Sequence, residues 1–341
     1  MRLIESVWTG DSPVDRVART ALAPFEGLYR SASAVRGWLY DAGLLKTESA
    51  AIPIVSVGNL TVGGTGKTPV SAWLAGLLAQ RGRSPAIVLR GYGGDEPLVH
   101  SRINPGIPVV IAPDRVEGIR EAVTLGADVA VLDDAFQHRR AARDLDIVLV
   151  SADDWMGRTR VLPAGPFREP FSAISRASAV FITRKSATDE QVAAVMHAVR
   201  SVAPEVNTAV VRLDLSELVR ANGVAGRMPA PILAGKRTLA VAAVGNPSAF
   251  FRQLHSLGAV VTPMPYPDHH LFTAGDVAEI SRKSQGVEYV VCTLKDAVKL
   301  GPVWPATNTP LWYVSLAIVV ESGQAEIDDL LMRLKGRIAV T

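Results

Sequence analysis

The sequence predicts an α/β protein in which a parallel-sheet domain is followed by a second, smaller α/β domain. The first observation is that apolar runs of strand length alternate with helical segments along most of the chain. The second is the length of 341 residues, which exceeds what one hydrophobic core usually serves. The third is a stretch rich in Gly, Ala and Pro at 221–236, which separates two sets of alternating elements. We therefore expect an N-terminal segment at 1–45, a first domain at 46–220 and a second domain at 221–341.

The elements of both domains follow from this alternation. In the first domain we expect strands at 52–57, 86–89, 109–112, 129–132, 146–150 and 179–183, and helices at 69–80, 115–125 and 189–202. In the second we expect strands near 239–244, 260–263, 289–293 and 312–314, and helices near 248–257, 275–283 and 325–334. Strands that alternate with helices in this way form parallel sheets through crossover connections.

The segment at 14–45 has the pattern of an amphipathic helix. Arginines at 16, 19, 30 and 36 supply positive charge, while Glu26 and Asp41 dilute it, and Pro24 is expected to interrupt the helix. Two interpretations are open, a helix that lies in a membrane interface and a helix packed on its own domain. The apolar residues recur mostly at steps of three or four, at Val17, Leu22, Phe25, Leu28, Tyr29, Val35, Trp38 and Leu39.

Composition excludes several classes of protein. The 36 basic and 33 acidic residues leave a diffuse net charge of +3, which does not indicate nucleic-acid binding. The one cysteine, Cys292, excludes an intramolecular disulfide and a zinc site with several cysteines. The N-terminus lacks the apolar stretch of a secretory signal, so a cytoplasmic location is expected, and no run of about 20 apolar residues could span a bilayer.

The strongest chemical signal is a glycine-rich run between the predicted strand at 52–57 and the predicted helix at 69–80. Glycines let backbone N–H groups converge on phosphate oxygens, and the following helix adds its positive N-terminal end. The order of strand, loop, Gly-Lys-Thr and helix therefore predicts a phosphate-binding loop, with a glycine-rich turn of no chemical role as the alternative. The residues expected to bind nucleotide are Thr61, Val62, Gly63, Gly64, Thr65, Gly66, Lys67 and Thr68.

Within this loop, Lys67 is expected to reach the β- and γ-phosphates of ATP and to act in catalysis, while the Thr68 hydroxyl holds Mg²⁺. The strict pattern Gly-x4-Gly-Lys-Thr is not met, because position 61 is Thr. The compact run at 63–68 instead resembles the deviant Walker A loops of the partition and metal-insertion ATPases. Val62 stands where those proteins carry an extra lysine.

Two acids, Asp133 and Asp134, follow the predicted strand at 129–132. Successive residues of an extended strand point to opposite faces, so the two carboxylates need not share one role. Outside this context, such a pair would most often cap a helix or form a turn. Beside a phosphate-binding loop, the pair indicates a Walker B site, and both residues are expected to contribute to the metal site.

The run Asp-Asp-Ala-Phe-Gln-His at 133–138, together with the loop sequence at 57–69, resembles the tetraacyldisaccharide 4′-kinase family, the lipid A 4′-kinases of Gram-negative bacteria. The resemblance covers nearly the whole chain, and so many motifs in one order are very specific. The shorter matches occur in the same order at 8–13, 90–94, 114–115, 162–170, 245–247 with 250–251, 268–269 and 295–299.

The resemblance implies transfer of the γ-phosphate of ATP, with Mg²⁺, to the 4′-hydroxyl of a diglucosamine that carries acyl chains and a 1-phosphate. It implies a P-loop NTPase fold, with the second α/β domain joined through a short two-stranded linker. It also implies a peripheral place on the cytoplasmic face of the inner membrane. This favours the membrane interpretation of the segment at 14–45, because the acyl chains of the acceptor stay in the bilayer and arginines favour an anionic lipid.

The resemblance further implies an Asp and a His that act as an acid–base pair from opposite sides of an interdomain cleft, here Asp95 and His269. On residue chemistry alone, the Asp-His-His run at 268–270 could equally form a metal cluster or a capped loop, and His270 is taken as a bystander. Asp95 lies in a run at 93–97 that fuses two motifs which the family usually separates. We expect that the intervening hairpin is deleted and that Asp95 keeps its role; the alternative is that another acid replaces it.

Five further residues are carried over from the family. Arg115 could contact phosphate, or it could be a surface arginine that begins a helix. Glu169 is a candidate second acid of the metal site, and its alternative is a turn residue between prolines. Lys295, Asp296 and Lys299 match the family, but no physical role follows for them from the sequence.

Three rival functions are open, and the first two come from other classes of protein. The first is a nucleotide-switched ATPase of the partition or metallochaperone type, against which Val62 and the lack of a Cys-x-x-Cys motif argue. The second is an interaction protein that binds nucleotide without turnover, although Lys67, Thr68, Asp133 and Asp134 are all present. The third is a soluble small-molecule kinase, which would leave the amphipathic N-terminal segment unexplained.

Overall fold

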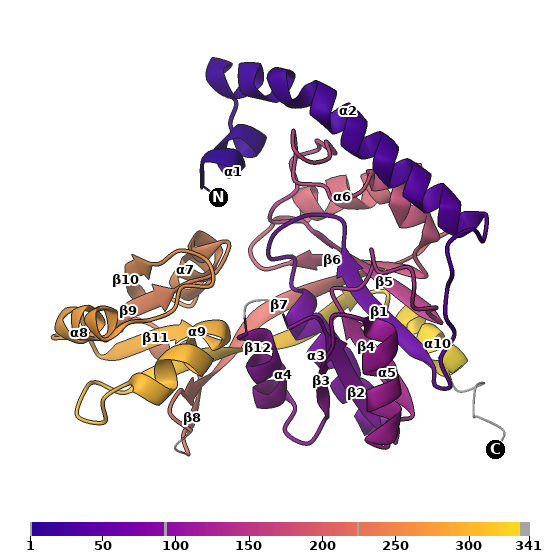
Figure 1. Cartoon of the computed structure of the whole chain (residues 1–341). Helices are drawn as coiled ribbons and strands as arrows, with labels where there is room; N and C mark the ends of the chain where they lie inside the picture. The colour runs from indigo at the N-terminus through magenta and orange to yellow at the C-terminus, as the bar shows by residue number, and fades with distance from the viewer. Residues whose placement is uncertain (1, 92–93, 224, 335–341) are drawn as a thin grey trace. The chain divides into compact units, whose positions relative to one another are not determined.

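The computed structural model describes residues 2–91, 94–223 and 225–334 (Figure 1). Counted over these residues, the chain forms two compact units, unit 1 from Met1–Arg90, Ile107–Val211 and Val320–Thr341, and unit 2 from Gly91–Gly106 and Arg212–Val319. The observed division differs in two ways from the predicted boundary near residue 221. The short segment at 91–106 groups with the second set of elements, and the C-terminal helix groups with the first.

Unit 1 is built on a sheet of parallel strands. Burial is continuous along the central strands, as expected where helices cover both faces of a sheet. The strands lie in the order β6 (Ala179–Arg184), β5 (Leu145–Ser151), β1 (Ile54–Asn59), β4 (Val129–Asp133), β2 (Pro85–Leu89) and β3 (Val109–Ile111). This confirms the predicted α/β class and the parallel sheet.

The helices of unit 1 bury their apolar residues against this sheet. Val116 and Ile119 pack in one cluster with Val88 and Leu132, and a second cluster joins Val195 to the strands β5 and β6. In the register of β1 and β4, Val57 is paired with Asp133, so the loop that leaves β1 begins beside the Walker B acids. The helices are α3 (Lys67–Gln80), α5 (Arg115–Thr124), α6 (Asp189–Val202) and α10 (Gln324–Arg333), with a 3₁₀ helix η1 at Phe171–Arg176.

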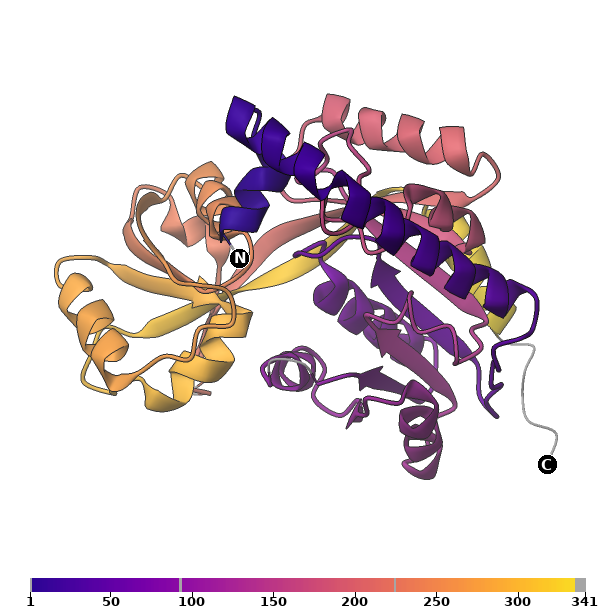
Figure 2. The ribbon, with the colours of Figure 1, turned by 45° about the horizontal axis from the view of Figure 1, so that its top comes forward.

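Two N-terminal helices, α1 (Arg2–Thr9) and α2 (Pro13–Asp41), precede the sheet of unit 1 (Figure 2). The prediction that Pro24 interrupts the helix is wrong, because α2 runs through it. Proline removes the hydrogen bond to the carbonyl of Thr20, but both residues are exposed, so water can replace that bond. No helix in the described ranges is long and apolar enough to cross a membrane.

The α2 helix docks on unit 1 through polar contacts. Glu26 is buried; it accepts a hydrogen bond from the Val161 N–H at 3.0 Å and pairs with Arg160 at 3.2 Å. Arg139 donates to the carbonyl of Gly37 at 3.0 Å. The apolar side of α2 is exposed, with Val14, Val17, Phe25, Leu28, Val35 and Trp38 between 56% and 76% accessible. The helix therefore buries the polar residues Arg19 and Glu26 while it exposes a row of large apolar side chains, unlike a helix that covers a core.

Unit 2 has its own parallel strands and two apolar clusters. The strands lie in the order β10 (Val260–Pro265), β9 (Arg237–Ala242), β11 (Tyr289–Thr293) and β12 (Leu311–Ser322). The helices are α4 (Glu96–Ile103), α7 (Pro247–Ser256), α8 (Ala274–Lys283) and α9 (Leu294–Leu300), with 3₁₀ helices η2 (Ala230–Leu233) and η3 (Gly301–Val303). Helix α4 packs on α9, which explains why the segment at 91–106 belongs to this unit.

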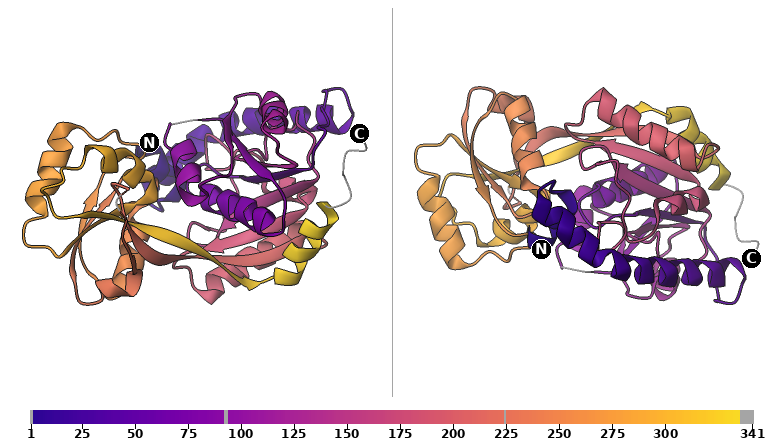
Figure 3. Two further views of the ribbon diagram at one scale, coloured as in Figure 1. Left: turned by 90° about the horizontal axis from the view of Figure 1, so that it is seen from below. Right: turned by 90° about the horizontal axis from the view of Figure 1, so that it is seen from above.

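Two long strands, β7 (Asn207–Arg220) and β12, carry the chain from one unit to the other, since the unit boundaries fall within them (Figure 3). No element was predicted at the position of β7, and the strand near 312–314 is longer than predicted, since β12 runs to Ser322. Charged residues recur along β7, and much of it is only partly buried, so the apolar pattern of a core strand is missing there. A short strand, β8 (Arg227–Pro229), pairs with β7 antiparallel.

Candidate active site

The glycine-rich loop between β1 and α3 is held by contacts with two neighbouring segments of unit 1. Gly63 and Gly66 have φ angles of +124° and +89°, a backbone conformation that other residues rarely adopt. Thr65 is buried; its carbonyl accepts a hydrogen bond from the Thr183 hydroxyl at 2.9 Å. The Val62 N–H donates to the carbonyl of Pro166 at 2.9 Å. These hydrogen bonds hold the loop against the segments at 166 and 183.

Lys67, the first residue of α3, lies over this loop. Its Nζ donates to the carbonyl of Gly63 at 3.4 Å and lies 4.0 Å from Oδ1 of Asp134. Thr61, Gly64 and Thr68 lie within the same strand–loop–helix unit, which has the geometry predicted for phosphate binding. Lys185, which follows β6, also reaches the loop, with its Nζ 3.4 Å from the carbonyl of Gly64.

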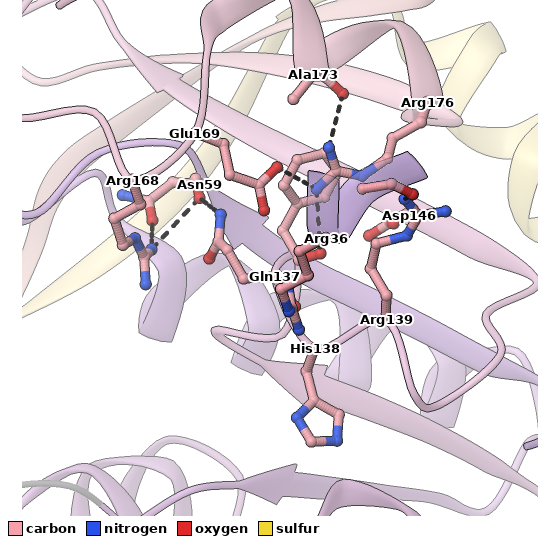
Figure 4. Close-up of polar contacts among 12 residues, drawn as sticks. Arg36, Asn59, Gln137, His138, Arg139, Asp146, Arg168, Glu169, Ala173 and Arg176 are labelled. Atoms are coloured by element: carbon pink, nitrogen blue, oxygen red, sulfur yellow. Dashed lines mark hydrogen bonds and ion pairs between the residues drawn. The ribbon is translucent and has the colours of Figure 1, made fainter. Parts of the chain in front are cut away.

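Asp134 faces two cations. Arg168 donates to its Oδ1 at 2.8 Å. Arg168 also donates to the side chain of Asn59 at the end of β1 (Figure 4). Desolvation acts against the ionised form, but the charges of Lys67 and Arg168 outweigh it and hold the pKa of Asp134 below its ordinary value. Asp134 is therefore ionised at neutral pH.

Asp133 has a different environment from its neighbour. Its side chain is buried, and Oδ1 accepts a hydrogen bond from the hydroxyl of Ser71 on α3 at 3.0 Å. Ser71 lies one turn beyond Thr68, so residues on this side of α3 and Asp133 belong to one site. The two adjacent acids thus face different partners, as the alternation of a strand end predicts.

Arg115, the first residue of α5, is buried, so the alternative of a surface arginine is wrong. Its guanidinium donates to the carbonyl of Ala112 at 2.8 Å and to that of Asp133 at 3.3 Å. Arg115 therefore fixes the backbone that carries the Walker B acids and adds positive charge beside them.

Glu169 is buried next to Arg176, at 2.6 Å from its Nη2 (Figure 4). The same guanidinium stacks over the ring of Phe136 at 3.8 Å. The structure thus gives Glu169 an ion-pair partner, Arg176. Among the described residues, no group of three or more His, Cys, Asp or Glu side chains is arranged to hold a metal ion.

The donors at the loop nevertheless fit a nucleotide-bound Mg²⁺. This ion usually keeps several waters and is held by one or two carboxylates together with phosphate oxygens, so a cage of three acids is not required. The buried carboxylate of Asp133 and the hydroxyl of Thr68 are oxygen donors of the expected kind. Asp134, whose oxygens already meet Lys67 and Arg168, is placed to orient the site.

The second candidate centre, Asp95 and His269, lies within unit 2. Asp95 precedes α4, and its side chain is 1% exposed; Oδ1 lies 3.3 Å from Nδ1 of His269. Oδ2 lies 3.6 Å from Nζ of Lys299 on α9. The two predicted acid–base residues are therefore in contact inside one unit, although the sequence analysis expected them on opposite sides of an interdomain cleft. Tyr92 and Gly93, part of the motif at 90–94, lie outside the described residues.

His269 differs from the adjacent His270 in its backbone conformation and in its side-chain contacts. His269 and Asp134 are the two non-glycine residues with a positive φ in the described part of the chain, at +58° and +50°. Residues held in this region are typical of functional sites. His270 instead pairs with Asp276 at 3.0 Å and stacks on Tyr266, as expected of a structural residue.

Sequence reasoning missed Arg168, which bridges β1 and β4 through Asn59 and Asp134. It also left Lys299 without a role. Arg168 stands next to Glu169 in the motif at 162–170, so the signal was present, but a guanidinium in a proline-rich turn gives no indication of which acid it meets.

Comparison with known proteins identifies the family. The model of the family described as tetraacyldisaccharide-1-P 4′-kinase matches residues 18–335. The chain therefore belongs to the tetraacyldisaccharide-1-P 4′-kinase family. The tetraacyldisaccharide 4′-kinase of Anaeromyxobacter dehalogenans (strain 2CP-C) is 39% identical over 332 residues, 89% of this chain and 87% of that protein. That of Geobacter metallireducens is 36% identical over 318 residues, 85% of this chain and 91% of that protein.

A solved member of this kinase family has a similar fold. The crystal structure of LpxK from Aquifex aeolicus in complex with ATP matches with a TM-score of 0.72 and 29% identity, over 93% of this chain and 99% of that one. These matches confirm the predicted family and fold class, and they do not favour the alternative of a partition or metallochaperone ATPase.

Proposed function

We propose that this kinase transfers the γ-phosphate of ATP to the 4′-hydroxyl of an acylated diglucosamine 1-phosphate, a step of lipid A biosynthesis. The observation that carries the proposal is the ordered loop of unit 1, where Lys67 meets the Walker B acid Asp134 at the end of the sheet, in a chain of this family. Phosphoryl transfer needs mainly positioning of the reactants and neutralisation of charge, and this loop has the groups for both.

In this proposal, the N–H groups of the loop at 61–66 cradle the phosphates, and Lys67 moves its charge from Asp134 onto the transferring group. Thr68 and Asp133 would hold Mg²⁺. Asp134 would orient these ligands, and Glu169 would be a second acid of the metal site. The metal ion supplies charge neutralisation at the phosphate oxygens. Arg115 stabilises the backbone of the Walker B acids through its hydrogen bonds to the carbonyls of Ala112 and Asp133, and it adds positive charge for the nucleotide.

The acceptor hydroxyl has to lose a proton as the new bond forms. Asp95 is the base in this proposal, because its buried carboxylate has an oxygen in contact with His269. His269, which is 31% exposed, lies where solvent or a substrate can reach it, and it orients Asp95 or shares its proton. His270 takes no part, since Asp276 holds it.

The exposed side of α2 supports a peripheral place on the cytoplasmic face of the inner membrane. A membrane-interface helix buries its apolar side in the boundary of headgroups and acyl chains while arginines contact anionic headgroups. The polar docking of α2 leaves this apolar side free, with Phe25 and Leu28 at 62% and 70% exposure.

We expect the double variant Phe25→Glu/Leu28→Glu to lose membrane binding. Burial of two such side chains contributes about 3 kcal/mol, which corresponds to roughly a 100-fold change in partitioning. The measurement is co-sedimentation with vesicles that contain phosphatidylglycerol. Leu125→Glu, at an exposed leucine after α5, is the matched control. Unchanged binding of the double variant would refute this role of α2.

We expect Asp133→Asn to raise the Mg²⁺ concentration required for activity, because the variant exchanges a charged ligand for a neutral amide. Asp134→Asn should lower the rate with a smaller change in Mg²⁺ requirement, since Asp134 already faces Lys67 and Arg168. The measurement is the initial rate over a Mg²⁺ titration at saturating ATP. The assignment fails if the titration curves of both variants coincide with that of the unmodified protein.

Acceptor dependence tests the proposed function against a nucleotide-switched ATPase. We expect ATP consumption to rise at least about tenfold when the acylated disaccharide 1-phosphate is added in detergent micelles, with one ADP formed per phosphorylated lipid, because positioned acceptor groups complete the transition state. A rate of ATP hydrolysis that does not respond to the lipid would contradict a kinase.

A further inference from the structure

Three charged side chains, Asp95, Asp296 and Lys299, form a cluster in unit 2. The proposed reaction gives a role to Asp95 but none to Asp296 or Lys299. Helices α4 and α9 pack together (Figure 1). They bring Asp95 to Lys299, whose Nζ lies 3.6 Å from Oδ2 of Asp95. The same Nζ lies 3.9 Å from Oδ1 of Asp296, one turn earlier on α9. The side chains of Asp95, Asp296 and Lys299 are 1%, 0% and 11% exposed, so water screens these charges little.

The two acids do not depend equally on Lys299. Asp296 accepts hydrogen bonds at Oδ2 from the Thr293 hydroxyl at 2.6 Å and from the Ala243 N–H at 3.1 Å. Burial raises the pKa of Asp296, while these hydrogen bonds act in the opposite direction. Neither carboxylate oxygen of Asp95 receives a hydrogen bond from the described residues. A buried carboxylate with no such donor needs a cation to remain ionised and in place.

We propose that Lys299 is a positioning residue for the transfer reaction: it fixes Oδ2 of Asp95, so that Oδ1 faces His269 and the acceptor. The inference rests on the proposed role of Asp95 as base. Asp296 in turn holds the ammonium group from the other side, anchored through Thr293 and Ala243. The ring of Phe272, 5.8 Å from Nζ, closes the site with an aromatic face.

The first measurement compares Lys299→Met with Lys299→Arg. We expect Lys299→Met to lower kcat by about 100-fold, with the KM for ATP unchanged, because the loss acts through the acid–base step. Lys299→Arg should recover most of the rate, since it restores the charge. Lys283→Met is the matched control, because it removes a lysine of the same unit from an exposed pair with Glu279.

The second measurement separates positioning from stability. Asp296→Asn/Lys299→Met removes one acid and one base, so the net charge of the cluster equals that of the unmodified protein, and the variant should be less destabilised than Lys299→Met alone. If Lys299 serves Asp95, this double variant is still about 100-fold slow. If Lys299 only neutralises Asp296, the double variant has a normal rate, and the inference is overturned.

The third measurement uses Asp95→Asn, alone and with Lys299→Met. Residues that act as one unit give non-additive losses, so we expect the double variant to be no slower than Asp95→Asn. Multiplicative losses would overturn the role of Lys299 and leave Asp95 as the base. An unimpaired Asp95→Asn would instead refute the proposed base itself, so the two failures are distinguishable.

Discussion

Lys67→Ala should lower the rate of phosphate transfer by about 10³-fold or more, the largest loss we expect from one substitution. Lys67 is the cation that lies over the glycine-rich loop, within 4.0 Å of Asp134. Its removal takes away a charge aimed at the transferring phosphoryl group from a preorganised site and leaves Asp134 paired with Arg168. The measurement is single-turnover transfer from labelled ATP at saturating acceptor.

Lys46→Ala is the matched control for this prediction, because Lys46 is a lysine of the same unit whose side chain is 82% exposed. Its rate should equal that of the unmodified protein. A Lys67→Ala variant with near-normal turnover would remove the assignment of the loop as the ATP site.

Asp95→Asn and His269→Ala should each lower the transfer rate by about 10²- to 10⁴-fold, the range of a positioned acid–base group. The two side chains are in contact at 3.3 Å, so they act as one unit, and the double variant should be little worse than the poorer single variant. The measurement is single-turnover transfer at saturating ATP across a range of pH.

His270→Ala is the control for the acid–base pair, since it removes the adjacent imidazole, which pairs with Asp276, and it should have a mild effect. Fully multiplicative losses for Asp95→Asn and His269→Ala would contradict a coupled pair. An Asp95→Asn variant with full activity would indicate that the shortened loop at 93–97 has moved the base to another acid.

Much of the fold follows from the sequence because buried parallel strands are continuous apolar runs. All six strands of the first sheet were predicted near their observed positions, as were α3, α5 and α6. The misses have physical causes. Strand β7 carries charges along a partly buried ribbon, and α4 is a short helix that begins at a Glu-Pro pair within a glycine-rich motif. The exposure of the apolar side of α2 could not be predicted, because periodicity fixes which residues share a side but not which side meets the protein.

The candidate site was predictable where one local segment carries it. The loop at 61–68 and the acids Asp133 and Asp134 are each set by a strand end, and parallel pairing brings them to one edge. Contacts between distant segments were not predictable. Nothing in the sequence indicates that Arg168 meets Asp134, that Arg176 pairs with Glu169, or that Lys299 reaches Asp95.

The position of the new phosphate on the lipid tests most directly whether the γ-phosphate is transferred to the 4′-hydroxyl. The purified kinase is incubated with γ-labelled ATP, Mg²⁺ and the acylated disaccharide 1-phosphate in detergent, and the lipid product is isolated and mapped by mass spectrometry and ³¹P NMR. We predict a bis-phosphorylated lipid that carries the label on the 4′-hydroxyl, and no labelled lipid with Lys67→Ala. Label released only as inorganic phosphate, or found at another position of the disaccharide, would contradict the account.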